Sequence, residues 1–159
     1  MSAAVVNIVL AGLGGQGVLK ASDIVAQAAF LSGADVKKSE IHGMSQRGGS
    51  VTSDVRFGPT VYSPMVPEGQ ADFLVVLSQD QVAANVHALR PGGVLIQPAG
   101  FDETRLKNRK ALNVALLGIL SRRLDLKIEL WHEAIRAALP EKLHAVNLEA
   151  FATGRGGDR

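Results

Sequence analysis

The stretch VVNIVLAGLGGQG at Val5–Gly17 decides the fold of this chain. An apolar run leads into three glycines, Gly12, Gly14 and Gly17, with the spacing G-x-G-x-x-G, and an amphipathic stretch begins directly after them. This order predicts a buried strand, a tight turn and the first turn of a helix. The spacing is also that of a dinucleotide-binding turn, in which the amino terminus of the helix faces an anion.

The rest of the chain alternates between short apolar runs and amphipathic segments. Strands are predicted at 5–10, 34–38, 51–57, 71–77 and 94–97, and helices at 15–32, 79–89, 113–124, 129–139 and 143–152. Residues 39–49 and 59–70 predict loops, and residues 90–93 predict the stop of a helix. Strands that alternate with helices through short connections are typical of the α/β class. We therefore predict a single three-layer Rossmann-like α/β domain over residues 1–159, with a mostly parallel sheet.

The composition of the chain excludes several classes of site and of function. The 159 residues include no cysteine, which excludes disulfides, a cysteine nucleophile, and iron–sulfur or zinc sites held by thiolates of this chain. A net charge of +2 is too small to indicate nucleic-acid binding. No apolar run approaches the roughly 20 residues that cross a bilayer, and the amino terminus lacks the basic region of a signal peptide. We expect a cytoplasmic protein that binds neither nucleic acid nor membrane.

The glycine turn alone does not establish a nucleotide site. A complete dinucleotide fingerprint carries an acidic residue about 20 positions further on, at the end of the second strand, where it holds a ribose. Here Asp35 stands at the start of the predicted second strand and Glu40 beyond its end. Two interpretations stay open: a stand-alone module that binds NAD or FAD, or glycines that only permit tight strand–helix packing. The candidate anion contacts are Gly12, Gly14, Gly15, Gln16 and Gly17.

No catalytic constellation is visible elsewhere in the sequence. The serines, Ser45 and Ser50 among them, lack the G-x-S-x-G pattern of a nucleophile elbow. The four histidines do not have ligand spacing on one helix, and the carboxylates form no evident pair. We expect no catalytic residue and no metal site on this chain.

A second loop concentrates residue types that are suited to binding. Glu40–Gly49 reads EIHGMSQRGG and follows a strand, and the carboxyl ends of strands in an open α/β sheet are where ligands and partners bind. Its arginine is suited to phosphate or carboxylate, and the glycines after it leave room for close approach. The alternative is an arginine that only caps neighbouring carbonyls. The candidate contacts are His42, Gln46, Arg47, Gly48 and Gly49.

Together the two motifs point to a family. GLGGQGVL at Gly12–Leu19, followed by EIHGMSQRGGSV at Glu40–Val51, resembles the gamma-type domain of 2-oxoacid:ferredoxin oxidoreductases. The His-Gly-Met-x-Gln-Arg-Gly-Gly form of the loop is most similar to that of the indolepyruvate enzymes. The resemblance covers nearly the whole chain, although the segment between Gly100 and Asn113 is shorter than is usual in the family. Further matching segments are Asp72–Val75, Asn113-x-x-x-Leu117-Gly118 and Asn147-Leu148-x-Ala150-Phe151.

The resemblance implies a subunit that binds no thiamine and is inactive alone. Thiamine diphosphate, Mg and [4Fe–4S] clusters would lie in a large alpha subunit, which agrees with the absence of cysteine here. The complex would oxidatively decarboxylate an arylpyruvate such as indolepyruvate, form an arylacetyl-CoA and pass electrons to ferredoxin. The glycine turn would contact an anion or coenzyme A (CoA), and the second loop the partner or CoA. A hetero-oligomer is expected; a structural homo-oligomer and a subunit for another 2-oxoacid are the alternatives.

Overall fold

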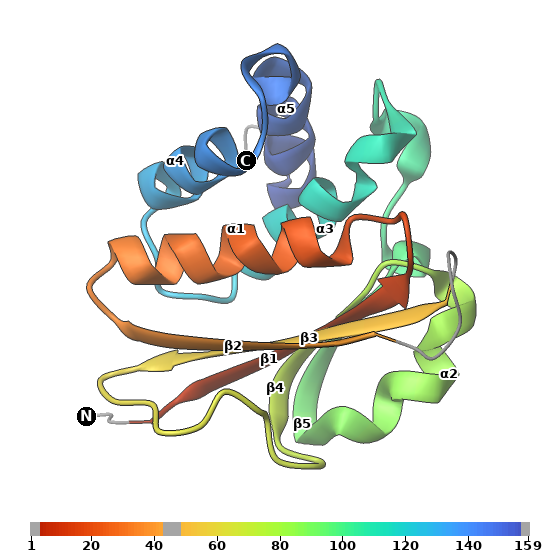
Figure 1. The fold of residues 1–159 in the computed structure, drawn as a ribbon. Helices are drawn as coiled ribbons and strands as arrows, with labels where there is room; N and C mark the ends of the chain where they lie inside the picture. Colours follow the sequence, from red (N-terminus) through yellow and green to blue (C-terminus); the bar gives the residue numbers. More distant parts are fainter. Residues whose placement is uncertain (1–3, 43–48, 157–159) are drawn as a thin grey trace.

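The structure, a computed structural model, describes residues 4–42 and 49–156 (Figure 1). The strands are β1 (Val6–Leu13), β2 (Asp35–His42), β3 (Ser50–Gly58), β4 (Ala71–Val76) and β5 (Leu89–Ile96). The α-helices are α1 (Val18–Leu31), α2 (Val82–Asn85), α3 (Leu112–Ser121), α4 (Ile128–Ala138) and α5 (His144–Arg155). Short 3-10 turns are η1 (Gln79–Gln81), η2 (Val86–Ala88), η3 (Pro98–Gly100), η4 (Glu103–Arg105), η5 (Arg109–Ala111) and η6 (Glu141–Leu143).

The five strands form one mixed sheet in the order β2-β3-β1-β4-β5. The β1–β4 and β4–β5 pairs are parallel, whereas β3 pairs antiparallel with both β1 and β2. Four strands therefore run in one direction, as the prediction of a mostly parallel sheet requires, and β3 alone is reversed. The physical reason is the short connection between β2 and β3, because a parallel crossover needs a dozen residues or more.

The order of the strands creates a switch point beside β1. The chain leaves β1 through α1 toward β2 at one edge of the sheet, and it leaves β4 toward β5 at the other edge. Neighbouring parallel strands whose connections diverge in this way leave a crevice outside their carboxyl ends, and ligands of open α/β sheets bind there. The glycine turn follows β1 at this crevice.

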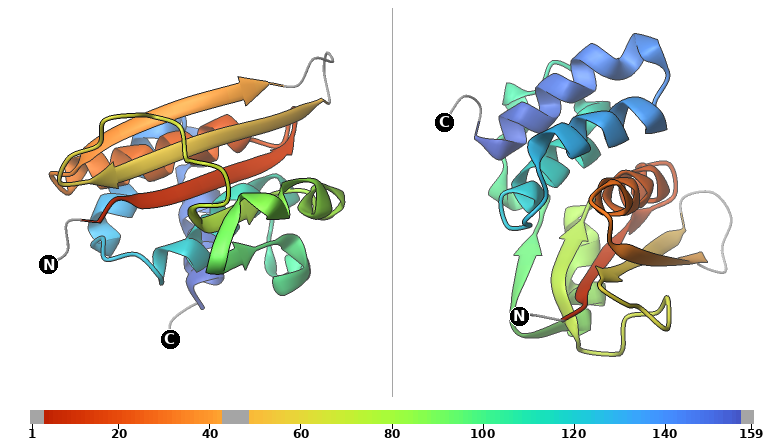
Figure 2. Two further views of the ribbon diagram at one scale, coloured as in Figure 1. Left: turned by 90° about the horizontal axis from the view of Figure 1, so that it is seen from below. Right: turned by 90° about the vertical axis from the view of Figure 1, so that its left-hand side faces the viewer.

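Helices cover the two faces of the sheet unequally. Figure 2 shows α1, α3, α4 and α5 on one side of the sheet, and the short α2 with the loop 59–70 on the other. The larger apolar core lies under α1 and includes Ile8, Val55 and Trp131, all fully buried. A smaller cluster on the opposite face includes Leu74 and Val76. The predicted three layers are present, and the third layer is thin.

Several boundaries differ from the sequence prediction. Strand β2 runs to His42, so residues 39–42, predicted as loop, belong to the strand, and Glu40 lies within β2 and not beyond its end. Residues 79–89 do not form one helix but the succession η1, α2 and η2, which bury no side chain fully. Short helices depend on tertiary packing for stability, and this segment has little of it. Residues 90–93, predicted as a stop, belong to β5, which pairs irregularly with β4 between Ala71 and Phe73. A glycine suits this irregularity, because a Cβ at Gly93 would lie 3.0 Å from the Ala71 carbonyl oxygen.

Helices α3 and α5 cross in direct backbone contact. A Cβ added at Gly118 of α3 would overlap the carbonyl oxygen of Phe151, and one added at Gly154 of α5 would overlap that of Ala115. Only glycine permits two helices to approach so closely. Arg155 Nη1 donates a hydrogen bond to Ser121 Oγ at 2.9 Å and ties the carboxyl ends of the two helices together. In the part of the chain that the structure describes, no helix is long and apolar enough to cross a membrane.

Candidate functional site

The predicted strand, turn and helix at the first motif are confirmed. The turn is closed by its own glutamine, whose Oε1 accepts a hydrogen bond from the Leu13 N–H at 2.7 Å, while the Gln16 N–H donates to the Leu13 carbonyl at 3.1 Å. Gly15 and Gly17 have φ values of 91° and 82°, in the left-handed region that favours glycine. Gln16 Oε1 therefore holds the turn in its shape.

The glycines of the turn serve different purposes. A Cβ at Gly12 would lie 2.8 Å from Gln16 Oε1 and 2.9 Å from Val18 Cγ2, and one at Gly17 would lie 2.5 Å from Asn113 Nδ2. At Gly15 a Cβ would meet nothing within 4 Å. Gly12 and Gly17 are thus needed for packing, whereas Gly15 faces open space.

The amino terminus of α1 has no side-chain cap. Its first backbone hydrogen bond runs from the Ala21 N–H to the Gly17 carbonyl at 2.9 Å. The N–H groups of the first turn, which come before Ala21, therefore have no carbonyl partner within the helix. Asn113 Nδ2 donates to the same Gly17 carbonyl at 3.2 Å and joins α3 to the turn. An uncapped amino terminus beside glycines is a favourable environment for an anion.

The structure brings the two sequence motifs together. His42 ends β2 opposite Val51 of β3, and Val51 lies opposite Gly12 of β1. The Gly14 N–H donates a hydrogen bond of 2.8 Å to the Gly49 carbonyl. Both ends of the second motif therefore flank the glycine turn. The predicted contacts Gln46, Arg47 and Gly48 lie outside the described residues.

Cavities lie on both sides of the turn. The larger, about 470 Å³, is lined by Gly15, Gln16, Gly17, Leu77, Arg109, Lys110, Leu112 and Asn113. The smaller, about 270 Å³, is lined by Leu13, Gly14, Gly15, Gly17, Val18, Leu19, Lys20 and Val51. Small-molecule sites usually have volumes of roughly 300–1,000 Å³, so the larger cavity has the size of a ligand site.

The carboxylates that a dinucleotide site would use are engaged elsewhere. Asp35 begins β2 at the end remote from the turn, and its Oδ2 accepts the Val61 N–H at 2.8 Å. This hydrogen bond, together with the one from Lys37, holds the pKa of Asp35 below its ordinary value. Glu40 pairs with Lys38. Neither residue is placed to hold a ribose.

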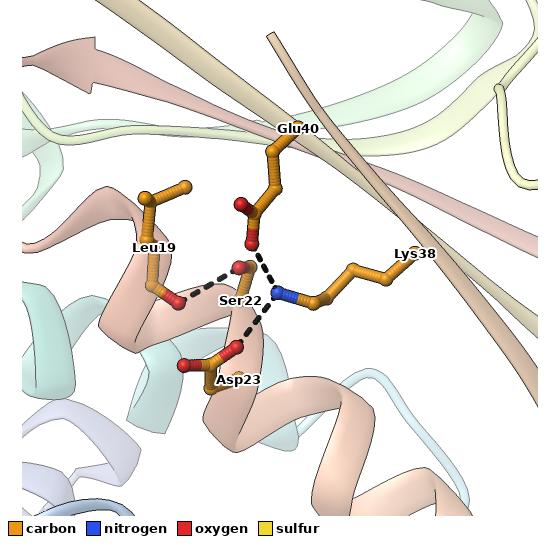
Figure 3. A network of polar contacts seen from close by, with 5 residues as sticks. All are labelled: Leu19, Ser22, Asp23, Lys38 and Glu40. Carbon is orange, nitrogen blue, oxygen red and sulfur yellow. Dashed lines mark hydrogen bonds and ion pairs between the residues drawn. The ribbon is translucent and has the colours of Figure 1, made fainter. Parts of the chain in front are cut away.

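Figure 3 shows Lys38 between Glu40 of its own strand and Asp23 of α1. The distance from Lys38 Nζ to Asp23 Oδ1 is 2.7 Å. Burial opposes the charged form of this lysine, but the hydrogen bonds to Asp23 and Glu40 outweigh that effect and raise the pKa of Lys38. The network fixes β2 against α1 close to the second motif, which is a structural role.

Sequence reasoning missed the basic wall of the larger cavity. Arg109 and Lys110 form η5 directly before α3, and they lie more than ninety positions from the glycine turn in the sequence. The only local signal is an asparagine cap followed by two basic residues: Asn108 Oδ1 accepts the Lys110 N–H at 2.9 Å. Among residues 4–42 and 49–156, no group of three or more His, Cys, Asp or Glu could hold a metal ion.

Comparisons with known proteins agree with this architecture. Residues 7–103 match the family model described as pyruvate ferredoxin/flavodoxin oxidoreductase. The indolepyruvate oxidoreductase subunits IorB of Thermococcus kodakarensis and Pyrococcus horikoshii are 34% and 32% identical, each over 93% of both chains. The gamma subunit of a keto/oxoacid ferredoxin oxidoreductase from Geobacter sulfurreducens has the same fold, with a TM-score of 0.81 and 23% identity over 98% of this chain and 97% of that one.

Proposed function

The chain belongs to the pyruvate ferredoxin/flavodoxin oxidoreductase family, and we propose that it is the subunit without thiamine in a complex that oxidises arylpyruvates such as indolepyruvate. Membership makes it a non-catalytic subunit of an oxidoreductase of the 2-oxoacid:ferredoxin type. The finer proposal rests on one observation: 34% identity over 93% of both chains to a relative named as an indolepyruvate oxidoreductase subunit.

The chemistry of the proposed complex divides between its subunits. An arylpyruvate loses CO2, the remaining acyl group is transferred to the thiol of CoA, and the electron pair released by the oxidation passes to ferredoxin. Thiamine diphosphate, Mg and [4Fe–4S] clusters would reside in a large partner subunit. The residues of this chain do not fit the clusters, because it contains no cysteine.

The two motifs support a role for this chain at the edge of the partner's active site. The glycine turn and the ends of the second motif lie together at the carboxyl edge of the sheet. Gly15 leaves the backbone of the turn accessible to a large cavity, which supports contact with an anionic group such as those of CoA. His42, Gln46, Arg47, Gly48 and Gly49 would contact the partner or CoA.

Co-expression with the large subunit tests the proposal. We expect the two chains to copurify, and the complex to reduce ferredoxin in a reaction that requires both indolepyruvate and CoA. The isolated chain should show no activity. A substrate panel with phenylpyruvate, pyruvate, 2-oxoglutarate and a branched-chain oxoacid determines the oxoacid. Activity of the isolated chain would refute the subunit role, and preference for pyruvate would refute the arylpyruvate assignment.

Arg47→Ala tests the second motif within that complex. If Arg47 contacts CoA or the partner, the variant should fold normally and lose activity roughly tenfold or more, since a charge-assisted hydrogen bond would be removed. A raised KM for CoA would indicate contact with CoA, and reduced copurification would indicate contact with the partner. Arg123→Ala, at an exposed position after α3, is the matched control. Unchanged activity of Arg47→Ala would make the arginine a structural residue.

A further inference from the structure

The face of the sheet opposite α1, α3, α4 and α5 is covered unequally. Over β1, β4 and β5 lie η1, α2 and η2, whose apolar side chains join the smaller core cluster. On the side of β3, the loop 59–70 crosses the sheet (Figure 2, left), and we call this loop the strap. Lys38 of β2 reaches Asp23 of α1, so Ile41, three positions further along the strand, faces the opposite side, where the strap lies. Ile41 is 50% exposed there.

The strap is fixed to the sheet by charged side chains of β2 and β3. Three hydrogen bonds of 2.8 Å hold its backbone, from the Val61 N–H to Asp35 Oδ2, from Arg56 Nη1 to the Ser63 carbonyl, and from the Val66 N–H to Asp54 Oδ2. Charged groups make stronger hydrogen bonds than neutral ones, and prolines at 59, 64 and 67 restrict the backbone further. The strap therefore has a defined conformation before any partner arrives.

The anchored strap presents two large side chains to the outside. Val61 is buried and Val66 packs against the smaller core cluster, so these two residues make the inward contacts. Between them, Tyr62 is 92% exposed and Met65 is 52% exposed. Side chains so exposed add little to the stability of the chain itself. A fixed backbone that presents an aromatic and a thioether side chain outward is typical of a protein interface.

Exposed apolar side chains are concentrated on this side of the molecule. Among the residues that the structure describes, five large apolar side chains are exposed. Ile41, Tyr62, Met65 and Val86 belong to the side of the strap, and Phe30, near the end of α1, belongs to the helical side. Single exposed apolar residues are normal, whereas this imbalance between two sides indicates an interaction surface. We call Ile41, Tyr62 and Met65 the strap face.

In some relatives the same domain is joined to a much larger piece of protein. The ketoisovalerate oxidoreductase subunit VorA of Methanothermobacter marburgensis is 35% identical over 72% of this chain, which corresponds to only 24% of that one. The 2-oxoglutarate:ferredoxin oxidoreductase of Magnetococcus marinus contains the same fold in 30% of its chain, with a TM-score of 0.82 and 20% identity. The IorB relatives match this chain over 93% of both lengths and lack such an addition. A subunit of that kind is held to its partner by surface contacts alone.

We propose that the strap face is the docking surface for the large partner subunit, and that Tyr62 enters an apolar pocket of that subunit as the anchor of the interface. Ile41 is followed directly by the second motif, which the proposed function places against the partner or CoA, so the two contact regions are continuous along the chain. Because the strap is already fixed, docking costs little conformational entropy. The identity of the partner rests on the proposed function.

Displacement of a tagged wild-type chain from the purified complex tests the proposal. Untagged wild-type chain should compete, and Tyr62→Ser/Met65→Ser should compete at least about tenfold less well, because a few anchor residues carry most of the energy of an interface. Phe30→Ser is the matched control, since it removes an exposed apolar side chain from the helical side, and it should change the competition less than about threefold. Both variants should melt within about 3 °C of the wild type, as expected for exposed positions.

Nitration of tyrosine gives an independent measurement. Tyr62 is the single tyrosine of the chain, so tetranitromethane reports on this one position when the peptides are identified by mass. Tyr62 should be nitrated readily in the isolated chain, and the modification should be lost in the complex. Complex formation that leaves the nitration of Tyr62 unchanged would overturn the inference.

The remaining outcomes separate this inference from the proposed function. Equal competition by Tyr62→Ser/Met65→Ser and Phe30→Ser, in a complex that assembles and reduces ferredoxin, would overturn the docking surface alone. A dimer of the isolated chain that the double variant dissociates would also overturn it, because the occupant would then be a second copy. If the wild-type chain forms no complex with the large subunit, the proposed function fails and the inference fails with it.

Discussion

Glycines serve opposite structural purposes in two regions of this molecule. In the turn between β1 and α1, Gly15 faces empty space and two cavities adjoin its backbone. Where α3 crosses α5, Gly118 and Gly154 face backbone carbonyls of the other helix. In the first region the missing side chain leaves open space beside the backbone, and in the second it lets the backbones of two helices touch.

The contrast shows that the conformation and the surroundings of a glycine must be assessed separately. Gly15 requires a left-handed backbone and has no steric neighbour, whereas Gly154 has an ordinary helical backbone and no space at all. Gly17 combines both constraints, because its φ is 82° and a Cβ would meet Asn113. Substitution by alanine should separate the three cases.

Gly154→Ala should have the largest effect. The new methyl group would overlap the Ala115 carbonyl oxygen, a backbone atom that cannot move without displacing α3. We expect a loss of about 3 kcal/mol or more in the free energy of unfolding, measured by urea denaturation. Gly100→Ala is the control, because a Cβ there meets nothing within 4 Å. A loss under about 1 kcal/mol would mean that the helices separate easily.

Gly17→Ala should have an intermediate effect. The left-handed backbone costs an L-residue about 1–2 kcal/mol, and Asn113 must also move. The substitution should therefore cost less in an Asn113→Ala background than in the wild type, as a double-mutant cycle of unfolding free energies can measure. Additive costs would show that Asn113 gives way freely and that only the backbone conformation matters.

Gly15→Ala should cost about 1 kcal/mol, from the backbone alone. Gly33 provides a matched control, since its φ is 97° and a Cβ there also meets nothing within 4 Å. The two alanine variants should lower the melting temperature by the same amount. A clearly larger loss at Gly15 would contradict the open environment on which the contrast rests.

The smallest expected effect is a pH dependence of folding stability that arises from His132 in the helical region. Burial lowers the pKa of His132 below its ordinary value of 6.5, the positive charges of Arg136 and Arg155 lower it further, and Glu129 opposes the shift. The unfolded chain then binds a proton more readily, so His132 contributes stability above about pH 6.5 that is lost as the pH falls toward the folded-state pKa.

His132→Gln should reduce the difference in melting temperature between about pH 7.5 and about pH 5.5, as circular dichroism can measure. His87→Gln is the control, because His87 lies in the thin layer on the other face of the sheet and is exposed. An unchanged difference in His132→Gln would show that the helical region does not sense acid through this residue.

Elements whose signals are local in the sequence could be predicted, whereas features that depend on contacts between distant residues could not. The glycine turn and helices α1, α3, α4 and α5 were predictable because their signals are local. The reversal of β3 was missed, since alternation of apolar residues does not give the direction of a strand. Residues 79–89 were predicted as one helix because their pattern is helical, but little packing supports it.

The candidate site was predictable only in part, for the same reason. The turn and the ends of the second motif were identified and meet at one edge. Arg109 and Lys110 were missed because their position depends on a tertiary contact, the hydrogen bond between Asn113 and Gly17. Two basic residues before a helix look like ordinary surface until the fold brings them opposite a glycine turn.

The burial of Trp131 gives the molecule an internal optical reporter. It is the single tryptophan of the chain, it is fully buried, and its ring centroid lies 5.6 Å from that of Phe151 in α5. Its emission should therefore follow the docking of α4 on α5, and it should shift when Gly154→Ala drives the helices apart. Ligands that enter beside the glycine turn should leave the emission unchanged. Tryptophan fluorescence can therefore distinguish a disrupted helical layer from an occupied cavity.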